Sequence, residues 1–449
     1  MEDPRTNDEA CNNNEETEDT QINFDDKDSY LTTEVAPALI ALHPFDQFVV
    51  VAVGSELRIF DLKKNCPVSL ADESKEMLHK ESIRAVCFSK NGKFLVSGGD
   101  DKLVKIWSSD TWQCLCTINS EKRVSAVAVS KDEEYVCFAD KFGVVWIVDI
   151  AELAENQPIP SKKAVAMFGH YCSIITSLEF SPDGQFIVSA DRDFKIRVTV
   201  FPKKPLNGVH EIQSFCLGHS EFVTCLTFVH NSEFPQGYLV SGSGDSTVCL
   251  WDITSGSLLS SSEVGKYVGT EDHQLPAAVT DICATPDGSL VAVAIQSLQG
   301  ILMMSCDLSN KTLNILEVVS IQEEAFFPTS LKMSSENKLW MVLGASNLPG
   351  SNPGSFTRLK VTSDIKKGSC DDSIEAKGLK DDEIPGGEPL LEKLQGSVAI
   401  ESSVISAVSD AVNVAMTNLL RKKHYPDDRR ELRKKTRNDK KFKQRVGSD

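Results

Sequence analysis

The sequence predicts an all-β protein in which seven small sheets close into one ring. The clearest evidence is the segment at residues 218–252, which opens with a Gly-His pair and closes with a Trp-Asp pair. Three short apolar strands separated by polar turns fit between these pairs, at residues 222–228, 238–241 and 247–251. This arrangement is typical of one blade of a WD-repeat β-propeller.

A hydrogen-bonded chain of side chains is expected inside this blade. A tight turn can place the carboxylate of Asp245 against the imidazole of His219. Ser241 and the indole N–H of Trp251 are candidates to extend the same chain into the blade. We therefore expect these four residues to stabilise the blade rather than to catalyse a reaction.

Sister repeats are required because one blade cannot bury both faces of its own sheet. Two further clear copies lie at residues 174–198, preceded by Gly169 and His170, and at residues 83–107, preceded by His79. Weaker copies, each with apolar strands and a turn, occupy residues 38–62, 124–150, 279–308 and 329–361. The repeats predict a seven-bladed propeller, and we expect residues 29–33 to supply the outer strand of the last blade.

The ends of the chain differ from the ring in composition. Residues 1–28 hold eleven acidic residues against Arg5 and Lys27 and are expected to be disordered. Apolar residues recur near helical spacing after residue 390, and this helix is expected either to pack on the ring or to bind a partner. The predicted organisation is an acidic tail at 1–28, the propeller at 29–361, a linker at 362–389, a helix at 390–420 and a basic tail at 421–449.

Composition excludes several classes of protein. The net charge is -18, and 41% of the 449 residues are hydrophobic, with no apolar run long enough for a membrane span and no signal-peptide pattern. The 13 cysteines form no CxxC pair, and the histidines are scattered, so no metal site is expected. The cysteines of the predicted strands are interpreted as buried free thiols in a reducing compartment: Cys87, Cys137, Cys225, Cys249 and Cys283.

No catalytic motif stands out, so an enzyme is not predicted and no cofactor is expected. The sequence contains no GxSxG, HExxH or P-loop, and no GxGxxG between a strand and a helix. Asp191 and Asp193 are close in sequence, but Arg192 lies between them and all three fall in a predicted hairpin turn. A neutralised turn explains them better than an acid/base pair.

One strand carries unusual charges. Lys195 and Arg197 stand where the other clear blades have Leu103 or Thr247 and Lys105 or Cys249, and Thr199 replaces the blade's tryptophan. Because side chains alternate along a strand, Lys195 and Arg197 share one face, opposite Ile196 and Val198. The two cations are either matched by acids inside the ring or exposed for a partner.

Two stretches, residues 189–198 and 214–223, resemble the WD-repeat, non-catalytic subunit of the tRNA (guanine-N7)-methyltransferase. The resemblance is clearest at residues 177–252. It implies a non-enzymatic nuclear partner of a separate Rossmann-like subunit that binds S-adenosylmethionine and methylates guanine 46 of tRNA. Lys195 and Arg197 are then similar to docking contacts for acidic residues of that subunit, and Lys141 to a further contact. Phe194 departs from the polar residue expected at its position.

Two alternatives remain open from the sequence. The ring is also compatible with a generic WD-repeat adaptor, for example in ubiquitin ligation or chromatin assembly. Residues 421–445 hold thirteen basic and four acidic residues, which suit either a polyanion such as tRNA or a nuclear import signal.

Overall fold

The computed structural model describes most of the chain after its acidic N-terminal segment. The described residues are 34–70, 78–155, 158–171, 173–209, 211–268, 277–321, 327–348, 355–368, 373–396, 402–418 and 420. The predicted tails at 1–28 and 421–449, and the strand expected at 29–33, lie outside the described residues.

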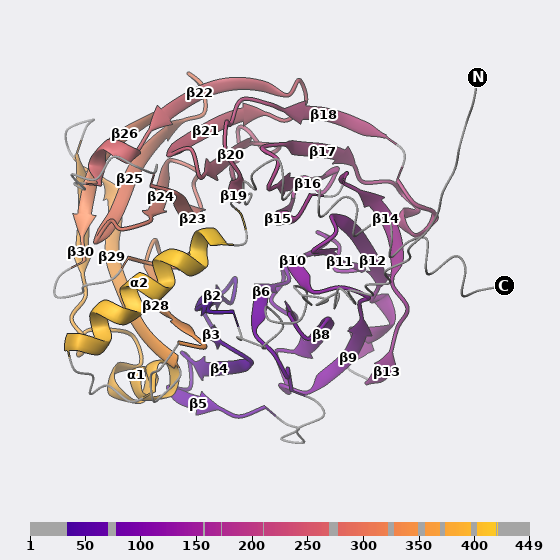
Figure 1. Cartoon of the computed structure of the whole chain (residues 1–449), viewed down its shortest axis with the longest axis horizontal. Helices are drawn as coiled ribbons and strands as arrows, with labels where there is room; N and C mark the ends of the chain where they lie inside the picture. Colours follow the sequence, from indigo (N-terminus) through magenta and orange to yellow (C-terminus); the bar gives the residue numbers. More distant parts are fainter. Residues whose placement is uncertain are drawn as a thin grey trace, which may run out of the picture. The chain divides into compact units, whose positions relative to one another are not determined.

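The described residues form seven mainly antiparallel sheets, numbered here as blades 1 to 7 along the chain (Figure 1). Blade 1 contains β2 (Leu39–Leu42), β3 (Phe48–Val53), β4 (Glu56–Asp61) and β5 (Cys66–Val68). Blade 2 contains β6 (Ile83–Phe88), β7 (Phe94–Gly99), β8 (Leu103–Ser108) and β9 (Cys114–Asn119), with β13 (Ile159–Ser161) added in parallel to β9. Blade 3 contains β10 (Val124–Val129), β11 (Tyr135–Asp140), β12 (Val144–Asp149) and β14 (Val165–Gly169).

The next three blades repeat this pattern of four strands. Blade 4 contains β15 (Ile175–Phe180), β16 (Phe186–Asp191), β17 (Ile196–Val200) and β18 (Ile212–Cys216). Blade 5 contains β19 (Val223–Val229), β20 (Tyr238–Ser243), β21 (Thr247–Asp252) and β22 (Ser257–Glu263). Blade 6 contains β23 (Val279–Ala284), β24 (Leu290–Ile295), β25 (Gly300–Asp307) and β26 (Thr312–Ser320). Short 3-10 helices lie at Ala151–Glu155, Pro205–Asn207 and Gly265–Tyr267.

The first strand of each blade lies innermost, and these strands contact one another in the order β2, β6, β10, β15, β19, β23, β27 and back to β2. Threonine hydroxyls join several neighbours across the ring. Thr176 Oγ1 donates to the carbonyl of Val223 at 2.6 Å, and Thr329 Oγ1 donates to that of Ala38 at 2.7 Å. The second bond joins the last blade to the first, which closes the ring. The predicted seven-bladed propeller is confirmed.

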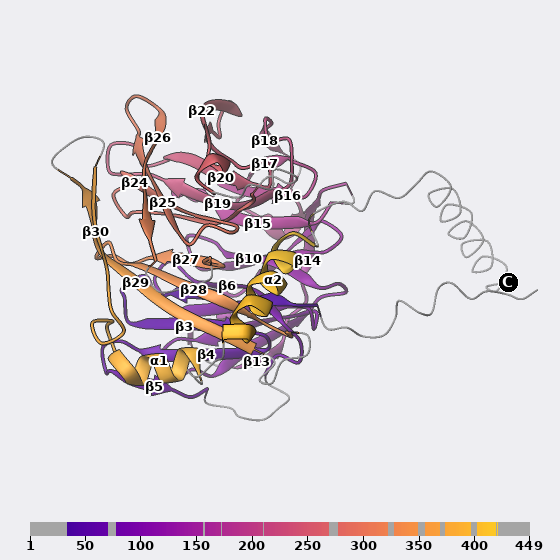
Figure 2. The same cartoon turned by 60° about the vertical axis from the view of Figure 1, so that its left-hand side comes forward.

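Blade 7 differs from the predicted closure. It contains β27 (Ser330–Met333), β28 (Leu339–Ser346), β29 (Ser355–Lys367) and β30 (Ile374–Gly378), and β1 (Ala36–Pro37) also pairs with β28. Its outer strand is therefore β30, at the edge of the ring in Figure 2. Strands β29 and β30 occupy part of the predicted linker at 362–389, so that assignment was wrong here. The polar composition reflects an outer strand with one solvated face, since β30 buries little of its length.

Valine-rich strands form the core of the blades, as the sequence predicts. All of β3 and β24 are buried because sheets pack against both of their faces. The described cysteines are free thiols; Cys137, Cys225, Cys249 and Cys283 are buried and Cys87 is half-buried. Among the described helices, none is long and apolar enough to cross a membrane.

Two helices occupy the region where one was predicted. α1 (Gly387–Gln395) ends at Gly396, whose φ of 77° favours glycine, and α2 (Ser402–Asn418) follows. Leu390 and Leu394 of α1 are buried in the core that contains Phe60 of β4. Arg58 Nη1 donates to the carbonyls of Leu394 and Gln395, both at 3.2 Å, and so satisfies the end of α1.

Helix α2 lies across blade 7 toward the centre of the ring (Figure 1). Val408 and Val412 are buried in the core that β24 and β28 form. Gln296 Nε2 in blade 6 donates to the carbonyl of Asn413 at 3.2 Å. Of the two roles considered for this region, packing on the propeller is the one that the described residues show.

The packing of α1 makes a prediction about stability. Leu390→Ala should lower the free energy of unfolding by about 2–5 kcal/mol, because it leaves a cavity in a closed core. Leu258→Ala, at a side chain that is 46% exposed on β22, should cost less than about 1 kcal/mol. Chemical denaturation of both variants tests this, and equal effects would contradict the packing of α1.

Candidate functional site

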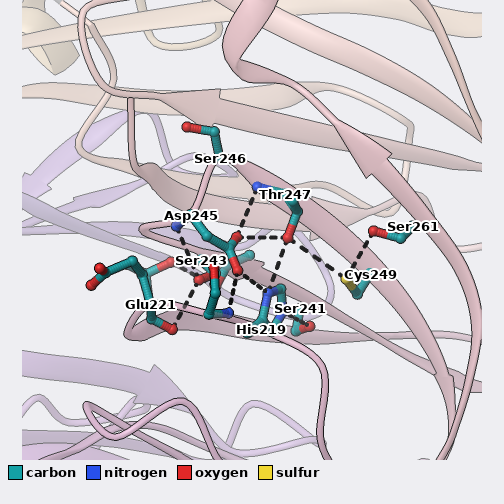
Figure 3. A network of polar contacts seen from close by, with 12 residues as sticks. His219, Glu221, Ser241, Ser243, Asp245, Ser246, Thr247, Cys249 and Ser261 are labelled. Carbon is teal, nitrogen blue, oxygen red and sulfur yellow. Dashed lines mark hydrogen bonds and ion pairs between the residues drawn. The ribbon is translucent and has the colours of Figure 1, made fainter. Parts of the chain in front are cut away.

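A chain of buried hydrogen bonds runs through blade 5 (Figure 3). His219 Nδ1 lies 3.1 Å from Asp245 Oδ2, and His219 Nε2 lies 2.7 Å from Ser241 Oγ. Trp251 Nε1 donates to the same Ser241 Oγ at 2.8 Å. The structure thus brings together all four residues that the sequence groups in this blade. The chain ties the loop before β19 to strands β20 and β21.

The Asp245 carboxylate also fixes the pKa of His219. Burial lowers the pKa of His219, but hydrogen bonds with Asp245 and Cys249 outweigh it and raise the pKa to about 9. Burial raises the pKa of Asp245, but hydrogen bonds from His219 and Thr247 hold it well below its ordinary value. The two side chains therefore form an imidazolium–carboxylate pair at neutral pH.

Equivalent chains occur in blades 2 and 4. In blade 2, His79 Nδ1 lies 2.8 Å from Asp101 Oδ2 and Nε2 lies 2.8 Å from Ser97 Oγ. In blade 4, His170 Nδ1 lies 2.8 Å from Asp191 Oδ2. Asp191 belongs to strand β16 itself, whereas Asp101 and Asp245 lie in the turn after the strand. The aspartate that contacts the histidine therefore lies earlier in blade 4, inside the strand instead of in the turn that follows it.

This shift shapes the turn between β16 and β17. Asp191 Oδ1 accepts hydrogen bonds from the backbone N–H of Asp193 at 2.7 Å and of Lys195 at 3.1 Å. Phe194 adopts a φ of 71°, a left-handed conformation. The buried carboxylate thus holds the histidine and the turn together, so Asp191 and Asp193 are not an acid/base pair. Sequence reasoning missed this role because it grouped the two aspartates in one turn.

Blade 3 builds its corresponding turn in the same way. Asp140 pairs with the start of β10 as Asp191 pairs with the start of β15. Asp140 Oδ1 accepts from the N–H groups of Phe142 at 2.8 Å and Val144 at 3.2 Å. Gly143 takes the positive φ that Phe194 takes in blade 4. Two neighbouring blades therefore present turns of one construction on the same side of the ring.

Lys195 and Arg197 follow the blade 4 turn, and the structure places them on the face that alternation predicts. Ile196 and Val198, which point to the opposite face, are fully buried, and the Lys195 side chain is exposed. Arg197 is half-buried with its guanidinium 4.5 Å from the centre of the Phe168 ring. Its Nε donates to Thr199 Oγ1 at 3.0 Å and its Nη1 to the carbonyl of Gly169 at 3.3 Å.

The surroundings of Arg197 hold its side chain against the outer strand of blade 3. Burial lowers the pKa of Arg197, though an arginine remains charged at neutral pH. The threonine that replaces the blade's tryptophan is therefore a hydrogen-bond partner for Arg197. A cation fixed in this way loses little conformational entropy when it binds a carboxylate.

Lys141 lies elsewhere on this side of the ring. It follows β11, is half-buried, and lines the mouth of the axial cavity between the blades. Its backbone N–H donates to the carbonyl of Arg123 at 2.9 Å. The structure therefore groups Lys195 with Arg197 at the junction of blades 3 and 4, and sets Lys141 closer to the axis.

Exposed apolar side chains lie on the turns and loops that neighbour the two cations, and sequence reasoning did not single them out as a group. They project from turns and loops of blades 3 to 5, where Phe142 is 61%, Tyr171 91% and Leu217 62% exposed. Lys122 Nζ lies 4.9 Å from the centre of the Phe142 ring. We call Phe142, Tyr171, Phe194, Lys195, Arg197 and Leu217 the rim patch. The sequence did offer one signal of this group, namely an aromatic residue in a turn that normally favours polar residues.

The arrangement suits recognition better than catalysis. The rim patch combines cations with aromatic and aliphatic side chains on a rigid sheet edge, a composition typical of protein interfaces. No group of three or more His, Cys, Asp or Glu side chains that could hold a metal ion occurs in the part of the chain that the structure describes.

Two family models match parts of this chain. A family model described as the tRNA methyltransferase TRM82 WD40 domain matches residues 154–363, which include blade 4 and the rim patch residues after Phe142. A model of the WD domain, G-beta repeat, matches residues 75–108. The comparisons confirm the resemblance predicted from the sequence.

Curated relatives are named as non-catalytic subunits of the tRNA (guanine-N(7)-)-methyltransferase. The tRNA (guanine-N(7)-)-methyltransferase non-catalytic subunit of Danio rerio is 32% identical over 283 residues, with 62% of this chain and 63% of the relative covered. That of Dictyostelium discoideum is 28% identical over 322 residues, with 68% and 65% covered. The chain thus spans less than two thirds of the length of each of these two relatives.

Solved structures share the fold. The structure of U3-55K matches with a TM-score of 0.55 at 20% identity, covering 68% of this chain and 88% of that chain. The crystal structure of RRP9 WD40 repeats matches with a TM-score of 0.56 at 21% identity, covering 68% and 87%. At this identity the likeness concerns the propeller alone.

The pair in blade 5 predicts how stability depends on pH. The folded pKa of His219 is about 9, above its ordinary value of 6.5, so the pair stabilises the fold fully below about pH 6.5 and loses its contribution as pH rises through 9. Asp245→Asn should lower the free energy of unfolding at pH 6.5 by about 1–3 kcal/mol.

The same variant should flatten the pH dependence between 6.5 and 9.5, which thermal unfolding at the two pH values measures. Glu221→Gln, at an exposed carboxylate near the same loop, is the control and should keep the slope of the unaltered protein. An unchanged slope in Asp245→Asn would contradict the charged pair.

Proposed function

We propose that this chain is the non-catalytic subunit of a tRNA (guanine-N7)-methyltransferase and that it docks and stabilises a separate catalytic subunit. The observation that carries the proposal is the rim patch, where Asp191 fixes the turn that presents Lys195 beside an immobilised Arg197. The family resemblance supports the identity of the partner. In this proposal the partner binds S-adenosylmethionine and forms N7-methylguanine 46 in tRNA, and this chain contributes no catalytic group.

The chemistry of the rim patch defines what the partner must offer. Two cations at the junction of blades 3 and 4 require acidic side chains that reach both Lys195 and the open side of Arg197. Phe142, Tyr171 and Leu217 require an apolar surface beside those acids. Because the turns are held by buried carboxylates, the patch needs little rearrangement on binding, which favours a stable complex.

Charge reversal at the exposed cation tests docking. Lys195→Glu should weaken the complex at least about tenfold, because it sets like charges against an acidic partner surface. Lys195 is the better single target, since Arg197 also contacts Phe168 and Gly169 within the ring. Copurification and calorimetry with the catalytic subunit measure the effect, and thermal unfolding shows whether the ring stays intact.

Lys131→Glu is the matched control, because Lys131 is also exposed but lies in the turn between the first and second strands of blade 3, β10 and β11, whereas Lys195 lies in a turn between second and third strands. It should leave the complex unchanged. Full affinity in Lys195→Glu, or a complex that lacks any methyltransferase, would favour the generic adaptor instead.

A direct contribution to tRNA binding is proposed for the basic tail. Residues 421–445 carry a net charge of +9 in a chain whose total is -18, so phosphates should meet the tail rather than the ring. Nuclear residence, with the paired lysines of the tail as an import signal, is the second role proposed for this segment.

Deleting residues 421–449 should weaken tRNA binding by the reconstituted complex and reduce its dependence on salt, because fewer counterions are released. Filter binding across a salt series measures both quantities. Unchanged affinity and slope would assign the RNA contacts to the catalytic subunit and leave the tail with import.

A further inference from the structure

A cavity of about 500 Å³ lies on the axis of the ring. The inner strands of all seven blades line it. The end of α2 covers one mouth with Ala415 and Met416, and Leu420 lies beside them. The volume falls in the range of small-molecule binding sites. The proposed docking of a partner at the rim patch does not involve this cavity.

A charged layer crosses the cavity. Thr176, Thr280 and Thr329 are equivalent, because each hydroxyl donates to a carbonyl of the next blade. Three residues after them in sequence stand Glu179, Cys283 and Lys332. These positions therefore share one level of the ring, and all three side chains line the cavity.

One acid near this layer is already satisfied. Asp281 Oδ2 accepts from the N–H of Leu331 at 2.7 Å and from Ser330 Oγ at 3.0 Å, and Oδ1 accepts from the N–H of Ile282 at 2.9 Å. Burial lowers the pKa of Lys332, but Asp281 and Glu179 outweigh it and raise the pKa. Lys332 therefore stays charged, and both carboxyl groups contribute to its counter-charge.

Glu179, the other acid of this layer, is held differently. Among the described residues it has no side-chain hydrogen bond and no ion pair within 4.0 Å, although the buried aspartates of blades 2, 4 and 5 each have several donors. Burial raises its pKa to about 7, with Lys332 opposing and Asp281 reinforcing the rise. Burial raises the pKa values of the thiols that line the cavity, so these thiols stay protonated: Cys87, Cys225 and Cys283.

We propose that the axial cavity binds a small organic amine whose ammonium group pairs with Glu179. Asp281 and Glu179 share the Lys332 ammonium, so one further positive charge balances this layer. A divalent cation is disfavoured by the nearby Lys332 ammonium, and an anion by the unpaired carboxylate. The thiol and aliphatic parts of the walls suit a short carbon chain.

Calorimetric titration of the full chain, free of RNA, with butylamine tests the proposal. We expect saturable binding to one site near pH 8 and about tenfold weaker binding near pH 6, where Glu179 is mostly protonated and the amine stays charged. Butan-1-ol, which has the same shape without the charge, should not bind. No saturable binding of butylamine, or equal binding of butan-1-ol, would overturn the proposal.

Two variants assign the site. Glu179→Gln should weaken butylamine binding at least about tenfold by removing the charge-assisted bond, while Glu221→Gln on the exposed rim should not. Retained affinity in Glu179→Gln would contradict the proposal. Amine binding is measured on this chain without a partner subunit. Its failure would therefore leave the proposed docking function unaffected.

Discussion

The hydrogen bond between a buried histidine and an aspartate at the end of the second strand is the constraint on which the blades depend. It joins the loop that enters a blade to the turn between its second and third strands, in blades 2, 4 and 5. Each of these groups would be costly to bury alone, so the contact forms completely or the loop cannot pack. The loops and turns on this side of the ring therefore have fixed positions.

The rim patch is a variation on this stabilising contact. In blade 4 the aspartate sits within the strand, and its second oxygen holds the turn that carries Phe194 and Lys195. Loss of the blade's tryptophan leaves Thr199 at that position, where it accepts a hydrogen bond from Arg197. Stability and recognition thus share one carboxylate, so a change at Asp191 is expected to affect both.

Burial decides the roles of the charged residues on this ring. Arg197 keeps its charge because it remains half-exposed between two blades, whereas Glu179 sits on the axis with no donor among the described residues. On a solvated face the same charged side chains would contribute little to stability or binding, because exposed ion pairs are weak. The rim and the axis therefore offer two chemically distinct sites on one rigid frame.

The sequence by itself determined the repeat, the number of blades and the residues of the blade 5 chain, because periodic strands and the Gly-His and Trp-Asp pairs of blade 5 are local patterns. It also determined that Lys195 and Arg197 share a face, since alternation along a strand needs no tertiary information. The family resemblance rests on residues 189–198 and 214–223, and each of these two stretches is continuous in the sequence. These features could all be read from short segments of the sequence and from their repetition along the chain.

Only the tertiary structure decided how the ring closes and what surrounds the charges. Strand β30 has a polar composition because one of its faces is solvated. From the sequence alone this segment could not be distinguished from a linker, so its pairing with β29 could not be predicted. Lys141 and Glu179 lie in ordinary strand and turn positions, and their places around the axial cavity follow from the packing of seven blades. Contacts between residues far apart in sequence depend on ring geometry, which no local pattern encodes.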